Sequence, residues 1–177
     1  GFCLVGSEMC IRDRYCSRLS PHLTYGTLSV KEIYKKLKDF KYKCEKKGLK
    51  YNKRGLSAFS SRLSWRCHFI QKLEDQPSIE NKCMHSSYEG MREKKSNTDT
   101  LKAWETGFTG FPFVDACMRS LTHNGWITFR MRAMLTSFAS YDLWIDWRES
   151  GYVLARLFTD YEPCLLYTSP SPRDRSL

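Results

Sequence analysis

The sequence predicts an all-α fold, with several helices packed on one another in a domain of ordinary size. Three observations support this prediction. Apolar residues recur at intervals of three and four along several stretches of the chain, which is the spacing of one helix face. Helix start and stop signals flank those stretches. Strand-like alternation, a glycine-rich phosphate loop and an internal repeat are all absent from the sequence.

The first predicted helix follows Ser29, because Glu32 stands three residues later at the spacing of a capping box. This helix places Ile33, Leu37 and Phe40 on one face. A polar, lysine-rich connector over residues 41–54 is expected to follow it.

A second helix is predicted from Gly55 to a stop at Pro77, and residues 80–100 are expected to form a surface loop with short helical pieces. Its apolar face carries Leu56, Phe59, Leu63, Cys67, Ile70 and Leu73.

The second half of the chain predicts two further helices and two short helical segments. One helix starts near Pro112, because proline suits the first helical turn. The next helix covers residues 126–138, and the short segments are residues 142–147 and 151–158. The residues expected to face the core are Val114, Met118 and Leu121 in the first helix and Met131, Leu135 and Phe138 in the second.

Composition narrows the kind of protein. The formal net charge of +10 indicates either a polyanion partner, most often nucleic acid, or a basic surface that binds nothing. No apolar run reaches the ~18 residues of a membrane span, and residues 1–14 do not form a signal peptide. Scattered cysteines without a CxxC pair predict reduced thiols, with neither a metal site nor a disulfide framework. We therefore expect an intracellular, soluble protein of unspecified compartment.

The two ends of the chain are expected to be of non-native origin. Residues 4–14 can be encoded by a DNA string whose reverse complement, read one base in, encodes the sequence of residues 164–174. The string also resembles a transposon-type sequencing-library adaptor. We therefore expect residues 1–14 and 164–177 to be translated adaptor and residues 15–163 to be a window of a longer protein. Without the ends the net charge is still about +9, since four basic and three acidic residues are removed.

An ordered series of motifs resembles the FAD-binding helical domain of the cryptochrome/DNA photolyase family. The series is "TGFPFVDACMR", "GW", "RMR", "SFASYDLWIDWR" and "LFTD", all between residues 104 and 163. Upstream, "SRLSP" and "GTLS" in residues 17–29 resemble another family segment, and "RLSWRCHFIQKL" stands at the place of a tryptophan-arginine helix. The resemblance spans nearly all of residues 15–163 and implies an all-α FAD-binding domain, incomplete here.

The resemblance implies a set of cofactor-binding residues. In a short turn, hydroxyl and backbone N–H groups can receive a pyrophosphate, although ordinary turn serines are the alternative. Arginines in apolar helices need an anion or a carboxylate partner. The resemblance also pairs Arg132 with Asp142, and a plain structural ion pair is the alternative. The implied FAD-binding residues are Ser17, Arg18, Leu19, Ser20, Arg66, Arg132, Asp160, which would accept the flavin N3–H, and Glu162, where the family usually has an aspartate.

Other matched positions are expected to act in electron transfer and in substrate binding. Trp147 matches a member of the family's tryptophan relay, whereas Trp144 is as well explained as a core residue. Trp65 matches a residue that stacks on the substrate of repair enzymes. Two neighbouring substrate positions depart from the repair pattern, because Arg62 replaces a glutamate and Phe129 an asparagine.

Two functions remain open for the longer protein. The first is a deoxyribodipyrimidine photo-lyase, in which excited reduced FAD donates an electron to a pyrimidine dimer in damaged duplex DNA. The second is a cryptochrome-type photoreceptor, in which a signalling protein reads the state of FAD. Arg62 and Phe129 favour the second function, while the basic charge and Arg130, which suits a phosphate, favour the first. A nucleic-acid-binding module without cofactor leaves Arg66, Arg132 and Asp160 unexplained. We expect a monomer away from membranes, an antenna pigment in the longer protein at most, and poor or absent FAD retention by this chain alone.

Overall fold

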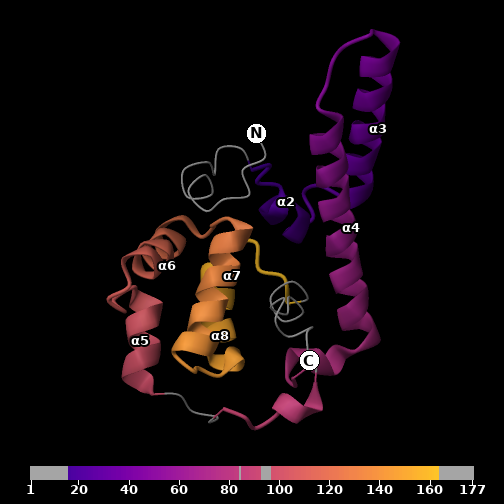
Figure 1. The fold of residues 1–177 in the computed structure, drawn as a ribbon. Helices are drawn as coiled ribbons and strands as arrows, with labels where there is room; N and C mark the ends of the chain where they lie inside the picture. The colour runs from indigo at the N-terminus through magenta and orange to yellow at the C-terminus, as the bar shows by residue number, and fades with distance from the viewer. Residues whose placement is uncertain (1–15, 84, 93–96, 164–177) are drawn as a thin grey trace.

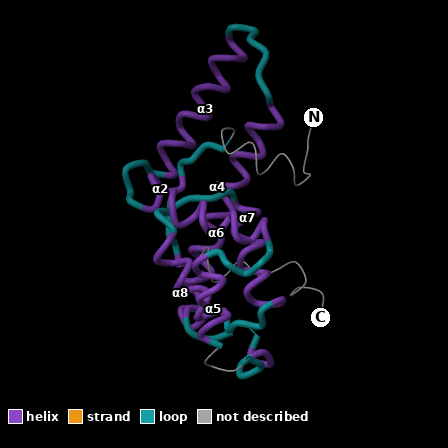
Figure 2. The backbone as a smooth tube through the Cα atoms, turned by 90° about the vertical axis from the view of Figure 1, so that its left-hand side faces the viewer, coloured by secondary structure: helices purple, strands orange, loops and turns teal. Residues whose placement is uncertain are grey.

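A computed structural model describes residues 16–83, 85–92 and 97–163 of the protein. Within these residues the chain forms helices and connecting loops, with no strand among them, so the all-α prediction is confirmed (Figures 1 and 2). The helices are α2 (Ser20–Thr24), α3 (Val30–Lys46), α4 (Lys53–Asp75), α5 (Thr98–Thr106), α6 (Pro112–Asn124), α7 (Phe129–Ser137) and α8 (Trp147–Leu157). The 3₁₀ turns η2 (Pro77–Glu80) and η3 (Ser86–Tyr88) and the π turn η4 (Phe138–Asp142) complete the described elements.

The helices α3 and α4 form a long hairpin, and its joined end, with α3 and the start of α4, extends away from the other helices (Figures 1 and 2). The predicted capping box is present, because Ser29 accepts from the Glu32 N–H and the Glu32 carboxylate accepts from the Ser29 N–H. The two helices are joined by the Tyr34 hydroxyl, which donates to the Ser60 carbonyl at 3.0 Å.

The predicted connector over residues 41–54 is wrong in its extent. Helix α3 continues to Lys46 and α4 starts at Lys53, because lysine is a good helix former and Cys44 is buried in the hairpin at 5% exposure. Asn52 then caps α4 by accepting from the Gly55 N–H at 2.8 Å.

Fewer of the predicted apolar residues are buried in the hairpin than their spacing suggests. Leu63 is buried, whereas Phe40 is 48% exposed and packs edge-on against the ring of Tyr51 at 6.0 Å. The other apolar residues predicted along α4 are half-buried. The helix ends at Asp75, just before Pro77, as predicted.

The hydrophobic core lies among α5, α6, α7 and α8, which pack together beside the hairpin (Figure 1). Trp104, Met118, Leu121, Leu135 and Leu154 are each fully buried there. The inward-facing residues predicted for α6 and α7 belong to this core or pack against it, which confirms that prediction.

The segment after α7 differs from its prediction. Residues 138–142 form a π turn, and Trp144 has a positive φ of 57°, so residues 142–147 do not form a helix. Trp144 is 54% exposed, and the interpretation of this residue as core is wrong. Asp146 instead caps α8 by accepting from the Arg148 N–H at 2.8 Å. Among the described helices, none combines the length and apolar character that crossing a membrane requires.

Candidate cofactor-binding site

The centre of the candidate site is an ion pair between α7 and the segment after α8. The Nη2 atom of Arg132 donates to Oδ2 of Asp160 at 2.8 Å, and its Nε donates to the Ile127 carbonyl at 3.0 Å. The guanidinium carbon lies 4.1 Å from the centre of the Phe158 ring. The pairing of Arg132 with Asp142 predicted from the resemblance is therefore wrong, since Asp142 ends the π turn at the surface with an exposed side chain.

Asp160 has one carboxylate oxygen that the described residues leave unsatisfied. Its side chain is 2% exposed, and Oδ1 is buried with no hydrogen-bond partner in the described part of the chain. A buried acceptor without a donor costs about 1–3 kcal/mol, and such groups in native proteins call for an explanation. An N–H donor from a bound molecule would satisfy this oxygen, so the site fits a cofactor that presents one.

A glycine turn fixes the position of Asp160. Gly125 ends α6 in the left-handed conformation, with φ of 66°, which favours glycine. The Gly125 carbonyl accepts from both the N–H of Thr159, at 2.9 Å, and its hydroxyl, at 3.1 Å. The residue before Asp160 is thereby attached to the turn that precedes Trp126.

Trp126 links this cluster to the N-terminal turn. Its Nε1 donates to the hydroxyl of Ser20 at 3.1 Å. The guanidinium carbon of Arg18 lies over the Trp126 indole, 5.0 Å from the ring centre. Arg132 lies 5.9 Å from the same ring. The structure therefore brings Arg18 and Ser20 to the same tryptophan as Arg132. Ser17 is exposed.

Leu19, in the same turn, faces a different neighbour. It lines a small cavity together with Leu28, Ile33 and Leu37 of the segment leading into α3 and of α3 itself. A contact of Leu19 with a cofactor would therefore use its backbone.

A second arginine–carboxylate pair joins the hairpin to the same C-terminal segment. Nη2 of Arg66, on α4, donates to Oε2 of Glu162 at 2.9 Å, and the two side chains are 18% and 23% exposed. Both arginines thus have the carboxylate partner that their half-buried positions require. The two carboxylates, Asp160 and Glu162, stand two residues apart, so one segment forms ion pairs with an arginine of α7 and an arginine of α4.

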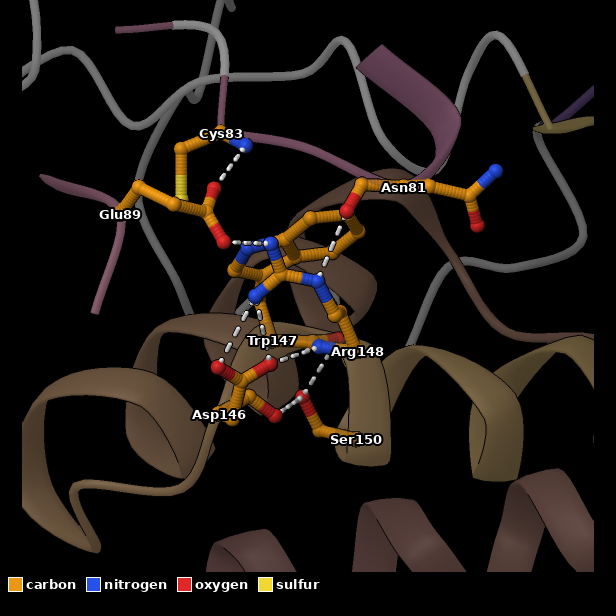
Figure 3. A network of polar contacts seen from close by, with 7 residues as sticks. All are labelled: Asn81, Cys83, Glu89, Asp146, Trp147, Arg148 and Ser150. Carbon is orange, nitrogen blue, oxygen red and sulfur yellow. Dashed lines mark hydrogen bonds and ion pairs between the residues drawn. The ribbon is translucent and has the colours of Figure 1, made fainter. Parts of the chain in front are cut away.

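Trp147 opens α8 within a polar network that sequence reasoning missed (Figure 3). The Arg148 guanidinium lies 4.7 Å from the Trp147 ring centre and forms ion pairs with Asp146, at 3.1 Å, and Glu89. Its Nε also donates to the Asn81 carbonyl at 3.0 Å. The network ties Asn81 and Glu89 to the start of α8 beside a half-buried indole. Its distant members gave no local signal, although the motif "IDWR" contained Asp146 and Arg148.

The contacts of this network stabilise the charged forms of Arg148 and Glu89. Burial alone would lower the pKa of Arg148, but the carboxylates of Asp146 and Glu89 raise it above its ordinary value. The hydrogen bond from the Cys83 N–H, at 2.9 Å, holds the pKa of Glu89 below its usual range, with a smaller contribution from Arg148. Both partners are therefore fully ionised at neutral pH.

The motif "TGFPFVDA" has a structural explanation that the sequence did not reveal. Asp115 reaches back from α6 to accept from the N–H and hydroxyl of Thr109, at 2.8 and 2.6 Å, and from the N–H of Gly110, at 3.1 Å. Burial would raise the pKa of Asp115, but these hydrogen bonds, those from Thr109 first, hold it below its ordinary value. This carboxylate therefore fixes the turn between α5 and α6.

The residues matched to substrate positions are all exposed. Arg62 and Trp65 lie on α4, and Phe129 and Arg130 open α7. Trp65 is 41% and Phe129 66% exposed, so both rings are accessible to a large ligand. Their substrate roles stay predictions.

The fold is that of a flavin-binding helical domain. Residues 59–169 match the family described as the FAD binding domain of DNA photolyase, and the chain belongs to this family. The match ends beyond the predicted boundary at residue 163. The predicted adaptor-derived ends, residues 1–14 and 164–177, lie outside the described residues, and their origin stays a prediction.

Relatives of known class agree with this assignment. The chain is 39% identical over 145 residues to a deoxyribodipyrimidine photo-lyase of Streptomyces griseus, covering 81% of the chain and 29% of that protein. An archaeal photolyase of Sulfolobus tokodaii solved with two FAD molecules is 30% identical, with a TM-score of 0.71 over 85% of the chain and 31% of that structure. A cryptochrome of Synechocystis sp. is 26% identical, with a TM-score of 0.74 over 86% of the chain and 30% of that structure. The chain thus spans less than a third of each of these relatives.

Proposed function

We propose that the protein to which this chain belongs binds FAD and repairs pyrimidine dimers in DNA with light, as a deoxyribodipyrimidine photo-lyase. The observation that carries the proposal is the Arg132–Asp160 pair with its unsatisfied, buried Oδ1. That oxygen lies in a cluster with Trp126 and Ser20, and the family to which the chain belongs is defined by FAD binding.

Each residue of the cluster has a defined task in this proposal. Asp160 would accept the flavin N3–H through Oδ1, and Arg132 would hold the Asp160 carboxylate in place through its Nη2 hydrogen bond. Arg66 would contact the pyrophosphate with guanidinium N–H groups other than the one given to Glu162. The turn at residues 17–20 would offer hydroxyl and N–H donors to the same group.

The chemistry itself belongs to the cofactor, and the protein supplies position and charge. When bound and reduced, FAD supplies on illumination the electron that splits the dimer. Trp147 is proposed as an electron-transfer residue, since its half-buried indole is held at the start of α8. Arg130 would contact a DNA phosphate and Trp65 would stack on the extruded dimer.

A second function is favoured by a specific departure from the repair pattern. At the position where repair enzymes carry a substrate-binding glutamate, Arg62 stands exposed on α4, and Phe129 replaces an asparagine. A guanidinium cannot act as the hydrogen-bond acceptor that a carboxylate provides. A cryptochrome-type photoreceptor, which binds FAD and signals to a protein partner without repair, is therefore the alternative.

The test separates cofactor binding from repair. The full-length protein is purified as wild type, as Asp160→Asn and as the matched control Asp142→Asn, and bound FAD is measured by absorbance. We expect Asp160→Asn to lose most of its FAD and Asp142→Asn to keep it, because Asp142 is exposed. Equal FAD content in the three proteins contradicts the assignment of the site.

Repair is then measured on the FAD-containing wild type. Illumination with dimer-containing duplex should restore the intact pyrimidines, and a dark sample serves as the control. Photoreduction of FAD without restored pyrimidines would refute the repair enzyme and support the photoreceptor. In that case Arg62→Glu tests whether the missing carboxylate is responsible.

A further inference from the structure

The largest concentration of charge lies outside the cofactor cluster, on the projecting hairpin. Residues 31–54 contain eleven basic and three acidic residues, a net charge of +8 in a chain whose total is +10. These residues form most of α3, the connecting loop and the start of α4, which extend away from the other helices (Figures 1 and 2).

Four of these lysines share one face of α3 with an exposed tyrosine. The spacing of four, three, four and four residues follows one side of a helix. It is opposite the side that carries the buried Ile33 and Cys44. Tyr42 is 64% exposed in the middle of the series. We call this face the lysine stripe, and its members are Lys31, Lys35, Lys38, Tyr42 and Lys46.

The positive charge of the stripe is not neutralised within the described structure. The four lysine side chains of the stripe are exposed, and none of them forms an ion pair with another described residue. Helix α3 is attached to its neighbours, because Tyr34 donates to Ser60 of α4 and the Phe40 ring packs against Tyr51 at 6.0 Å. A row of lysines on one helix therefore faces solvent.

We propose that the lysine stripe binds the phosphates of one strand of a DNA duplex, as a contact separate from the cofactor cluster. The fifteen residue steps from Lys31 to Lys46 rise about 22 Å along the helix. One DNA strand presents a phosphate about every 3.4 Å of axis, so the stripe spans roughly six or seven phosphates. Four lysines on that length match a backbone contact that carries no base specificity.

Other polyanionic partners fit this face less well. Protein interfaces have apolar cores that are depleted of lysine, whereas this face has lysines and one tyrosine. A membrane-bound amphipathic helix needs a free apolar face, and the apolar face of α3 is turned towards α4. The tyrosine adds a ring that suits packing against sugar or base. DNA is therefore the partner that the observations favour.

The test measures binding of the full chain to undamaged duplex in the dark, where neither FAD nor repair is required. The stripe variant is Lys31→Gln with Lys35→Gln and Lys38→Gln. Fluorescence anisotropy gives the affinity at several salt concentrations between about 50 and 200 mM. We expect the slope of log K against log salt to become shallower by roughly 2 to 3, because each lost phosphate contact removes about 0.9.

The matched control is Lys36→Gln with Lys43→Gln and Lys47→Gln, which removes the same charge from another side of α3 and from its C-cap. We expect its slope to change by less than about 1. Replacing the three stripe lysines by arginine should keep the wild-type slope, and circular dichroism checks the helix content of every variant.

Equal losses in the stripe and control variants would overturn the proposal, since they would show a general charge effect. An unchanged slope in the stripe variant would also overturn it and would leave an acidic protein as the partner to be tested. Because this assay uses undamaged DNA in the dark, its outcome is independent of whether the proposed repair function is correct.

Discussion

Gly125→Ala is expected to destabilise the protein because two separate costs meet at the turn before Trp126. The first cost is conformational, since Gly125 has φ of 66° and a residue with a Cβ pays about 1–2 kcal/mol there. The second is steric, since the new Cβ would lie 2.5 Å from Cγ2 of Thr159. Thr159 cannot turn away freely, because its hydroxyl donates to the Gly125 carbonyl at 3.1 Å.

The steric cost follows from the contact that has to yield. If Thr159 rotates, the hydroxyl bond is lost, at about 0.5–1.5 kcal/mol. The expected total loss for Gly125→Ala is therefore about 1.5–3.5 kcal/mol in the free energy of unfolding, measured by urea denaturation. Gly26→Ala is the matched control, because Gly26 has φ of 69° and a Cβ added there would meet nothing within 4 Å. It should show the conformational cost alone, about 1–2 kcal/mol.

A double-mutant cycle separates the two costs. Thr159→Ser removes Cγ2 and keeps the hydroxyl, so Gly125→Ala should cost only about 1–2 kcal/mol in that background. An equal cost of Gly125→Ala in both backgrounds would refute the steric explanation. A cost no larger than that of Gly26→Ala in the wild-type background would refute it as well. Since Asp160 follows Thr159, the same variant should also lower FAD content in the full-length protein.

Three further predictions concern the ion pairs and the buried carboxylates. Arg148→Met should lower the free energy of unfolding by about 2 kcal/mol, because it removes charged hydrogen bonds beside α8. Arg156→Met, from an exposed pair, should cost less than about 0.5 kcal/mol in the same urea titration. The depressed pKa of Asp115 contributes stability that is present above its unfolded pKa, near 4, and lost as pH falls through its folded pKa. Asp115→Asn should therefore flatten the acid limb of stability against pH. Arg132→Met should cost about 3–5 kcal/mol by leaving the Asp160 charge buried, and less once Asp160→Asn is added.

Local signals in the sequence were sufficient to predict most of the helices. The capping box at Ser29 and Glu32 and the proline at position 112 each act within one helical turn, and both helices start where these residues indicate. The connector at residues 41–54 was mispredicted for the opposite reason. Its lysines are compatible with either a helix or a loop. The helix forms here because Cys44 is buried in the hairpin, and no local sequence pattern shows that burial.

The residue types of the site were predictable, but their partners were not. Arg66 and Arg132 were identified as arginines that need an anion, and each has a carboxylate. The family resemblance suggested Asp142 for Arg132, whereas Asp160 is placed by the hydrogen bonds between Gly125 and Thr159. Pairs that lie 28 and 96 residues apart in sequence depend on how α6, α7 and α4 pack.

The two ion pairs change the reason why arginines are tolerated inside these helices. Glu162 and Asp160 already compensate Arg66 and Arg132, so a bound dianion is not required to keep them there. Each guanidinium has five N–H donors, and its carboxylate accepts from Nη2. The pairs therefore orient the two guanidinium groups and leave further N–H donors for a pyrophosphate. This lowers the conformational entropy that the arginines would lose on binding. It follows that the packing of α4 and α7 against the C-terminal segment does not depend on the cofactor's charge, and that the cofactor would add its contacts to two arginines that already have carboxylate partners.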